Sequence, residues 1–128
     1  MSDEANIRVI IVDDVPETRE NIRKLLQFES DIEVAGVAAT GREGIQLARD
    51  ILPDVVLMDV VMPGLNGFQA TRQLTKGAAT KDIPVILVTT KDQETDRVWG
   101  KRQGAVGYLV KPVDSNELLS VIATAMAG

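Results

Sequence analysis

The chain has 128 residues, 45% of them hydrophobic and 26% charged, which predicts one globular domain with its own core. Its net charge of −5 disfavours nucleic acid as a direct partner, because a phosphate backbone requires a basic face. The absence of Cys and His excludes disulfides, thiol or imidazole nucleophiles, and metal ligands of either type. No apolar run reaches the roughly 20 residues of a membrane span, and residues 1–4 lack the basic start of a signal peptide. We therefore expect a cytoplasmic protein in which oxygen atoms hold any metal ion.

The first part of the chain alternates between apolar runs and helical patterns. Residues 7–12 are, apart from Arg8, apolar on both faces, which is typical of a buried parallel strand. Pro16 is favourable at a first helical position, and the apolar residues after it recur at helical spacing. A weaker strand is predicted over residues 33–37. Thr40 with Glu43 then gives the capping-box pattern at the start of a second helix.

The middle of the chain continues this alternation. Residues 55–58 form a second apolar run that predicts a buried strand. A helix follows over Gly67–Lys76, with its apolar residues on one side. Residues 84–88 are the third apolar run and therefore the third clear strand.

The last part supplies three further elements. A polar helix is predicted over residues 92–103, a weaker strand over 108–110, and a final helix after the cap residue Asp114. A glycine is expected to end each helix. Strand and helix thus alternate about five times, which predicts an α/β fold: a doubly wound, five-stranded parallel sheet flanked by five helices, in a single domain over residues 1–128.

Polar side chains stand where the predicted strands end. In an open parallel sheet, ligands bind beyond the carboxyl ends of the strands, and the residues there are Asp13, Asp14, Asp59, Thr89 and Lys111. Taken singly, each has an ordinary interpretation: an Asp caps a turn, a Thr fills a strand and a Lys is a solvated charge. Three clustered carboxylates repel one another unless a cation lies among them. Their joint placement therefore favours a site for a hard divalent ion such as Mg²⁺.

Four stretches carry a resemblance to a known family. The sequences VIIVDD (9–14), PDVVLMDVVMPGLNG (53–67), IPVILVTT (83–90) and GYLVKP (107–112) resemble receiver domains of two-component response regulators. The resemblance covers essentially the whole chain and implies a flavodoxin-like sheet with strand order 2-1-3-4-5. It also implies a phosphorylation-dependent signalling switch that catalyses only its own phosphorylation and dephosphorylation, rather than an enzyme acting on other substrates.

The resemblance assigns roles to individual residues. It implies that Asp59 is the phosphoacceptor, that Lys111 pairs with a phosphoryl oxygen, and that Thr89 donates its hydroxyl to another. It further implies that Mg²⁺ is the cofactor, with ligands or water-mediated contacts from Asp13, Asp14, Asp59 and the backbone carbonyl of Val61.

The same resemblance predicts the moving parts of a switch. Tyr108 is expected to change its rotamer as Thr89 moves, and the Lys111–Pro112 peptide bond is expected to be cis. Trp99 has two interpretations, as a packing residue of the fourth helix or as a contact on the output face formed by that helix, the fifth strand and the fifth helix.

The implied partners are a histidine kinase or phosphotransfer domain, docking near residues 17–24, and a downstream protein target. We expect no direct binding of nucleic acid, no membrane insertion, and a monomer or weak dimer. The second half resembles stand-alone receivers of the chemotaxis-like pathway that governs pilus-driven twitching motility, whereas the first half resembles receivers attached to other output modules. Two alternatives follow: a receiver fragment of a longer DNA-binding response regulator, or an engineered fusion of two receivers.

Two other function classes agree less well with the sequence than a receiver does. A phosphatase of the haloacid dehalogenase type has an acid two residues after its nucleophile, where this chain has Val61. A nucleotide or flavin binder of the same fold would need a glycine-rich phosphate loop or several aromatic residues, and the chain has neither.

Overall fold

The computed structural model describes residues 6–127 and contains one parallel sheet. Its strands are β1 (Ile7–Val12), β2 (Ile32–Ala38), β3 (Val55–Met58), β4 (Val85–Thr89) and β5 (Gly107–Val110). They lie in the order β2-β1-β3-β4-β5, and all four pairings are parallel. The predicted flavodoxin-like order is therefore confirmed.

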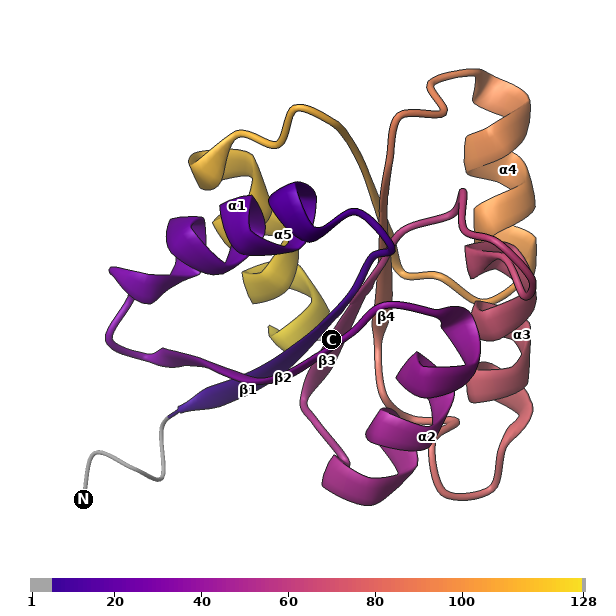
Figure 1. Ribbon diagram of the computed structural model, residues 1–128, viewed down its shortest axis with the longest axis horizontal. Helices are drawn as coiled ribbons and strands as arrows, with labels where there is room; N and C mark the ends of the chain where they lie inside the picture. Colours follow the sequence, from indigo (N-terminus) through magenta and orange to yellow (C-terminus); the bar gives the residue numbers. More distant parts are fainter. Residues whose placement is uncertain (1–5, 128) are drawn as a thin grey trace.

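Five helices alternate with the strands and cover both faces of the sheet (Figure 1). They are α1 (Pro16–Gln27), α2 (Gly41–Ile51), α3 (Gly67–Lys76), α4 (Glu94–Arg102) and α5 (Ser115–Ala127). Helices α1 and α5 pack on one face, and α2, α3 and α4 lie on the other. Within residues 6–127, no helix combines the length and the apolarity that crossing a membrane requires.

The alternation of side chains along each strand divides the core into two layers. On the side of α1 and α5, Val9 and Ile11 of β1 pack with Ile22 of α1 and Leu118 of α5. On the opposite side, Ile10 packs among residues of α2 and α3. Because both faces are covered, the central strands are apolar throughout, as their sequences indicated.

The helix ends agree only partly with the sequence prediction. The Thr40 hydroxyl oxygen accepts a hydrogen bond from the Glu43 amide at 3.1 Å, which confirms that cap. The prediction of a glycine at every helix end was wrong: the C-cap residue of α1 is Phe28, and that of α2 is Leu52, whose φ of 52° is left-handed. A glycine does follow two helices: Gly77 is the C-cap residue of α3, and Gly104, with φ of +107°, comes after the C-cap residue of α4.

The end of β4 and the start of α3 both bear on the site residues. β4 extends through Thr89, so this residue is the last of the strand rather than the first after it. Gly67 begins α3 directly against the loop after β3, where a Cβ atom would overlap the carbonyl oxygen of Asp59. The Gly67 amide donates to the Val60 carbonyl at 2.8 Å, so the absence of a side chain lets α3 pack onto the loop that carries Asp59.

Candidate functional site

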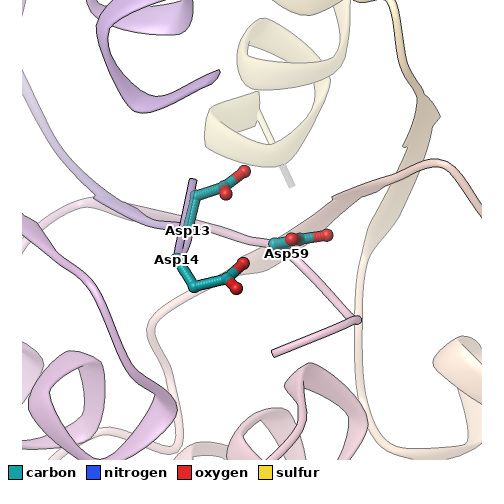
Figure 2. Close-up of side chains that lie close together, drawn as sticks. All are labelled: Asp13, Asp14 and Asp59. Carbon is teal, nitrogen blue, oxygen red and sulfur yellow. The ribbon is translucent and has the colours of Figure 1, made fainter. Parts of the chain in front are cut away.

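Three carboxylates meet at the carboxyl edge of the sheet (Figure 2). Asp13 and Asp14 follow β1, and Asp59 follows the neighbouring strand β3. One oxygen from each lies within 4.8 Å of the others. Asp13 is only 1% exposed and Asp59 only 5%, so two of the three are withdrawn from bulk water. The sequence prediction that these side chains converge is confirmed.

Backbone hydrogen bonds fix the two loops that carry these acids. The Asp13 amide donates to the Ala38 carbonyl at 3.0 Å, and the Asp59 amide donates to the Val12 carbonyl at 2.9 Å. Both bonds extend the sheet pairing beyond its last strand residues. Each loop is therefore held in register by the neighbouring strand, which explains how adjacent strands deliver their acids to one point.

Side-chain contacts orient the acids further. The Val15 amide donates to Asp13 Oδ1 at 2.9 Å, and the Val60 amide donates to Asp59 Oδ1 at 2.8 Å. Arg19, on the first turn of α1, donates from Nη1 to the Asp13 backbone carbonyl at 2.8 Å. The sequence did not single out Arg19, because nothing in its spacing distinguishes it from the other charges of that helix.

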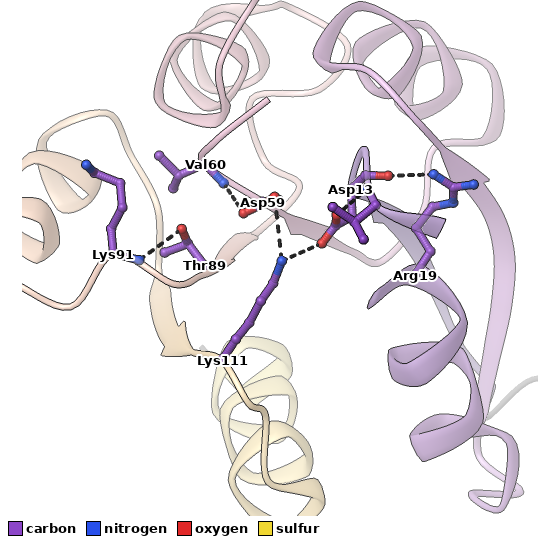
Figure 3. A network of polar contacts seen from close by, with 8 residues as sticks. Asp13, Arg19, Asp59, Val60, Thr89, Lys91 and Lys111 are labelled. Carbon is purple, nitrogen blue, oxygen red and sulfur yellow. Dashed lines mark hydrogen bonds and ion pairs between the residues drawn. The ribbon is translucent and has the colours of Figure 1, made fainter. Parts of the chain in front are cut away.

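Lys111 provides the positive charge of the site (Figure 3). Its Nζ lies 2.8 Å from Asp13 Oδ2 and 3.5 Å from Asp59 Oδ2, and its side chain is 15% exposed. The residue follows β5, and the peptide bond to Pro112 is cis, as predicted. Lys111 therefore bridges the acids of two other strand ends.

The surroundings of Asp59 oppose its ionisation. Burial raises the pKa of this carboxyl above its ordinary value, and the neighbouring Asp13 raises it further. Lys111 and the backbone N–H groups of Val60 and Val61 act in the opposite direction, but they do not cancel the rise in pKa. A further cation among the carboxylates would favour the charged form of Asp59.

The donor set suits a hard divalent cation. Three carboxylates within 4.8 Å of one another supply oxygen ligands, and Mg²⁺ is commonly held by a few carboxylates together with water. Asp14 is partly exposed, which leaves the cluster open to water on one side. The contribution of the Val61 carbonyl stays a prediction, and the Val61 side chain is 57% exposed.

Thr89 and Tyr108 are joined through Lys91. The fully buried Thr89 accepts a hydrogen bond from the Lys91 amide at 3.3 Å, and the Tyr108 hydroxyl donates to the Lys91 carbonyl at 2.9 Å. The Arg97 guanidinium lies 5.0 Å from the centre of the Tyr108 ring. Burial raises the pKa of Tyr108, and Asp96 adds to that rise. Arg97 belongs to the polar helix predicted over residues 92–103, and the sequence did not indicate its contact with Tyr108.

Trp99 lies outside this network. It is 49% exposed on α4 and is therefore not part of the buried core. Its neighbour Val98 is 46% exposed, and the two residues form an apolar area on the outer surface of that helix. Trp99 is therefore available to solvent, as the alternative interpretation requires.

The family model for the response regulator receiver domain matches residues 9–123. The chain belongs to this family of receiver domains. Protein PilH of Pseudomonas aeruginosa is 58% identical over 121 residues, which cover 94% of this chain and 98% of PilH. Several longer curated relatives also match, and the chain spans only 55–58% of their length.

Solved structures give the same result. The response regulator domain of Thermotoga maritima CheB has a TM-score of 0.88 at 33% identity, covering 96% of this chain and 98% of that domain. The receiver domain of the sensor histidine kinase PA1611 from Pseudomonas aeruginosa has a TM-score of 0.86 at 26% identity, covering 97% and 100%. That structure is described with a magnesium ion coordinated in its active-site cleft.

Proposed function

We propose that this receiver is a phosphorylation switch in which Asp59 accepts a phosphoryl group from a histidine kinase or phosphotransfer domain. The observation that carries the proposal is the convergence of Asp13, Asp14 and Asp59 with the Lys111 ammonium at one edge of the sheet. A phosphoryl donor is anionic, so a carboxylate can attack it only where positive charge compensates both groups.

Mg²⁺ fits the three carboxylates and is the proposed cofactor, with the Val61 backbone carbonyl as a further ligand. The magnesium ion in the PA1611 receiver supports this choice. When bound, the ion would supply charge neutralisation for the donor and for Asp59. Asp13 already bonds to Lys111 at 2.8 Å, so we expect this acid to act on the metal mainly through water, and Asp14 to be the more available ligand.

The protein residues would then act as follows. An Asp59 carboxylate oxygen attacks phosphorus, the bond from phosphorus to the donor nitrogen breaks, and the imidazole keeps the electron pair. Lys111 is close enough to form an ion pair with a phosphoryl oxygen on Asp59, since its Nζ lies 3.5 Å from Asp59 Oδ2. The Thr89 hydroxyl accepts a hydrogen bond from Lys91, so its own proton remains free to be donated to a second phosphoryl oxygen.

The path from the phosphate to the surface runs through Lys91. A Thr89 hydroxyl drawn toward the phosphoryl group would strain its bond with the Lys91 amide, and the Lys91 carbonyl holds the Tyr108 hydroxyl. Displacing this loop would therefore release or reposition Tyr108 and alter the surface of α4, β5 and α5. A downstream protein that binds that surface would sense the change.

The relationship to PilH supports a pilus-related, chemotaxis-like pathway as the setting. PilH aligns across both halves of the chain, so one relative spans the regions that resemble different receivers. We propose a cytoplasmic protein that acts as a monomer or weak dimer through protein partners, without direct binding of nucleic acid or membrane insertion. The surface of α1 around residues 17–24 is the proposed kinase contact.

Incubation with acetyl phosphate and Mg²⁺, followed by intact-protein mass measurement, tests this function. The wild type should gain one phosphate, and Asp59→Asn should gain none. Asp82→Asn is a matched control because Asp82 is exposed and far along the chain from the cluster. Equal labelling of Asp59→Asn and wild type would refute the proposal, and release of many equivalents of phosphate per protein would instead indicate a phosphatase.

A further inference from the structure

A shallow groove runs between α2 and α3, which lie next to each other on one face of the sheet (Figure 1). Its volume is about 500 Å³, and it is lined by Arg49 of α2, by Gln69, Arg72, Gln73 and Lys76 of α3, and by Leu65 and Gly77. Three of these residues are cationic and none is acidic. The groove is therefore positively charged, whereas the chain as a whole has a net charge of −5.

The three cations are not neutralised within the described structure. Over residues 6–127, the ion pairs join other basic side chains to acids, and none involves Arg49, Arg72 or Lys76. Arg49 and Lys76 lie in the last turns of their helices, where a positive charge is favourable. Arg72 has no such explanation, and it precedes Lys76 by four residues, a spacing at which like charges destabilise a helix. Helix stability alone does not account for the cluster.

We propose that this groove docks an acidic segment of a partner protein. The stripe from Gln69 to Lys76 is about 10 Å long at the helical rise per residue, which suits a peptide that presents several carboxylates in a row. Gln73 adds an amide that can bond to a peptide backbone, and Leu65 offers an apolar contact at one end. A free small anion fits less well, because small-molecule sites enclose most of their ligand and this groove is open.

The proposed docking surface differs from the surfaces that phosphorylation and the kinase would use. It lies on α2 and α3, whereas the proposed output surface is formed by α4, β5 and α5. Leu65 belongs to the loop that starts at Asp59, so the groove and the phosphoacceptor share one loop. The inference goes beyond the proposed function: the receiver would hold a partner at the groove while the phosphate acts elsewhere.

Fluorescence anisotropy with a short labelled oligoglutamate peptide tests the proposal. The triple variant Arg49→Gln, Arg72→Gln, Lys76→Gln should bind the peptide about tenfold more weakly than wild type, since three exposed charge pairs are lost. The control triple variant Lys24→Gln, Lys101→Gln, Arg102→Gln removes the same net charge from exposed positions elsewhere and should change the affinity by less than about twofold.

Titrating the protein with the peptide while monitoring its backbone amide NMR chemical shifts locates the contact. Shifts confined to α2 and α3, around Gln73 and Gly77, support the proposal. Equal weakening in both triple variants, shifts centred on α4, or no binding in low salt would overturn it. Pyrophosphate that competes as strongly as the peptide would overturn the choice of a peptide ligand. Thermal unfolding of each variant shows whether it folds, and Arg72→Glu, a single exposed substitution, should also weaken binding if the triple variant does not fold.

Discussion

The carboxyl edge of the sheet and helix α4 are both rich in charge, yet the two regions hold their charges differently. At the edge, Lys111 bonds to the buried Asp13 at 2.8 Å and lies 3.5 Å from the buried Asp59. Arg97 of α4 pairs with Asp92, two residues before the helix, at 3.8 Å, and both side chains are well exposed. Gly100 is the one residue of α4 that is buried.

This difference leads us to expect chemistry at the edge and movement at α4. Charges at the edge are desolvated, so each depends on the others and on a cation for its stability. Exposed pairs on α4 contribute little free energy, and the helix buries little apolar surface. We therefore expect α4 to be the element that a change at Thr89 displaces, and the edge to stay fixed around Asp59. The following predictions test this contrast, starting with the largest effect.

Lys111→Met should give the largest loss of stability. Removing the ammonium leaves Asp13 and Asp59 buried beside each other without a cation, and breaking a buried pair of this kind typically costs about 3 kcal/mol or more. Urea unfolding in magnesium-free buffer measures the effect. Lys101→Met, at an exposed position of α4, is the control and should cost less than about 0.5 kcal/mol. Similar losses in both variants would contradict the contrast between the two regions.

Magnesium should stabilise the edge specifically. An ion that binds only the folded state adds about 2.7 kcal/mol to the free energy of unfolding at 100 times its dissociation constant. We expect most of this gain to disappear in Asp14→Asn and to remain in Asp82→Asn. Thermal unfolding with and without Mg²⁺, at constant ionic strength, measures it. A gain that persists in Asp14→Asn would argue against that residue as a ligand.

The raised pKa of Asp59 predicts a pH-dependent effect of Asp59→Asn in metal-free buffer. Because the pKa of Asp59 is higher in the folded state, wild type keeps its full free energy of unfolding below the ordinary pKa of 3.8. Part of that free energy is lost as the pH rises through the folded-state pKa and Asp59 becomes charged. The Asn variant does not undergo this loss. It should therefore be more stable than wild type at neutral pH, and the difference should vanish on acidification below pH 3.8. A variant that is less stable than wild type at neutral pH would contradict the assigned cause.

The smallest effects are expected at α4 and just before its start. Asp92→Asn removes the exposed partner of Arg97 and should change the free energy of unfolding by less than about 0.5 kcal/mol, as measured by urea unfolding.

Arg97→Ala should raise the pKa of Tyr108 further, because the guanidinium of Arg97 lowers that pKa in the wild type. Ultraviolet titration of the tyrosine measures this shift, with Arg102→Ala as the control. An unchanged titration would remove Arg97 from the contacts that control Tyr108.

Trp99 offers a spectroscopic test of movement in α4. Its half-exposed position makes its fluorescence sensitive to a displacement of the helix. Adding beryllofluoride, a phosphate mimic, with Mg²⁺ should change the emission in wild type and leave it unchanged in Asp59→Asn. Identical emission in wild type before and after addition would count against coupling between the edge and α4.

The sequence predicted the parts of the molecule that depend on local pattern. Two-sided apolar runs predicted β1, β3 and β4 within a residue or two, because the part of a strand that is covered on both faces must be apolar; Arg8 of β1 lies in the exposed start of its strand. It also predicted that Asp13, Asp14, Asp59 and Lys111 gather at one edge, since parallel strands present their carboxyl ends together. Helix ends were less predictable: Leu52 adopts a left-handed conformation that no local pattern indicated.

From the sequence alone, the succession of strands and helices along the chain followed from the spacing of apolar residues. The alternation of strands and helices indicated a parallel sheet, and this placed the acidic residues at neighbouring strand ends. The tertiary structure alone decided which groups touch across elements: Lys111 with Asp13, Arg19 with the Asp13 carbonyl, Arg97 with Tyr108, and the basic groove between α2 and α3. Those contacts depend on how long, flexible side chains from separate helices and loops meet in space, and spacing along the chain does not encode that geometry.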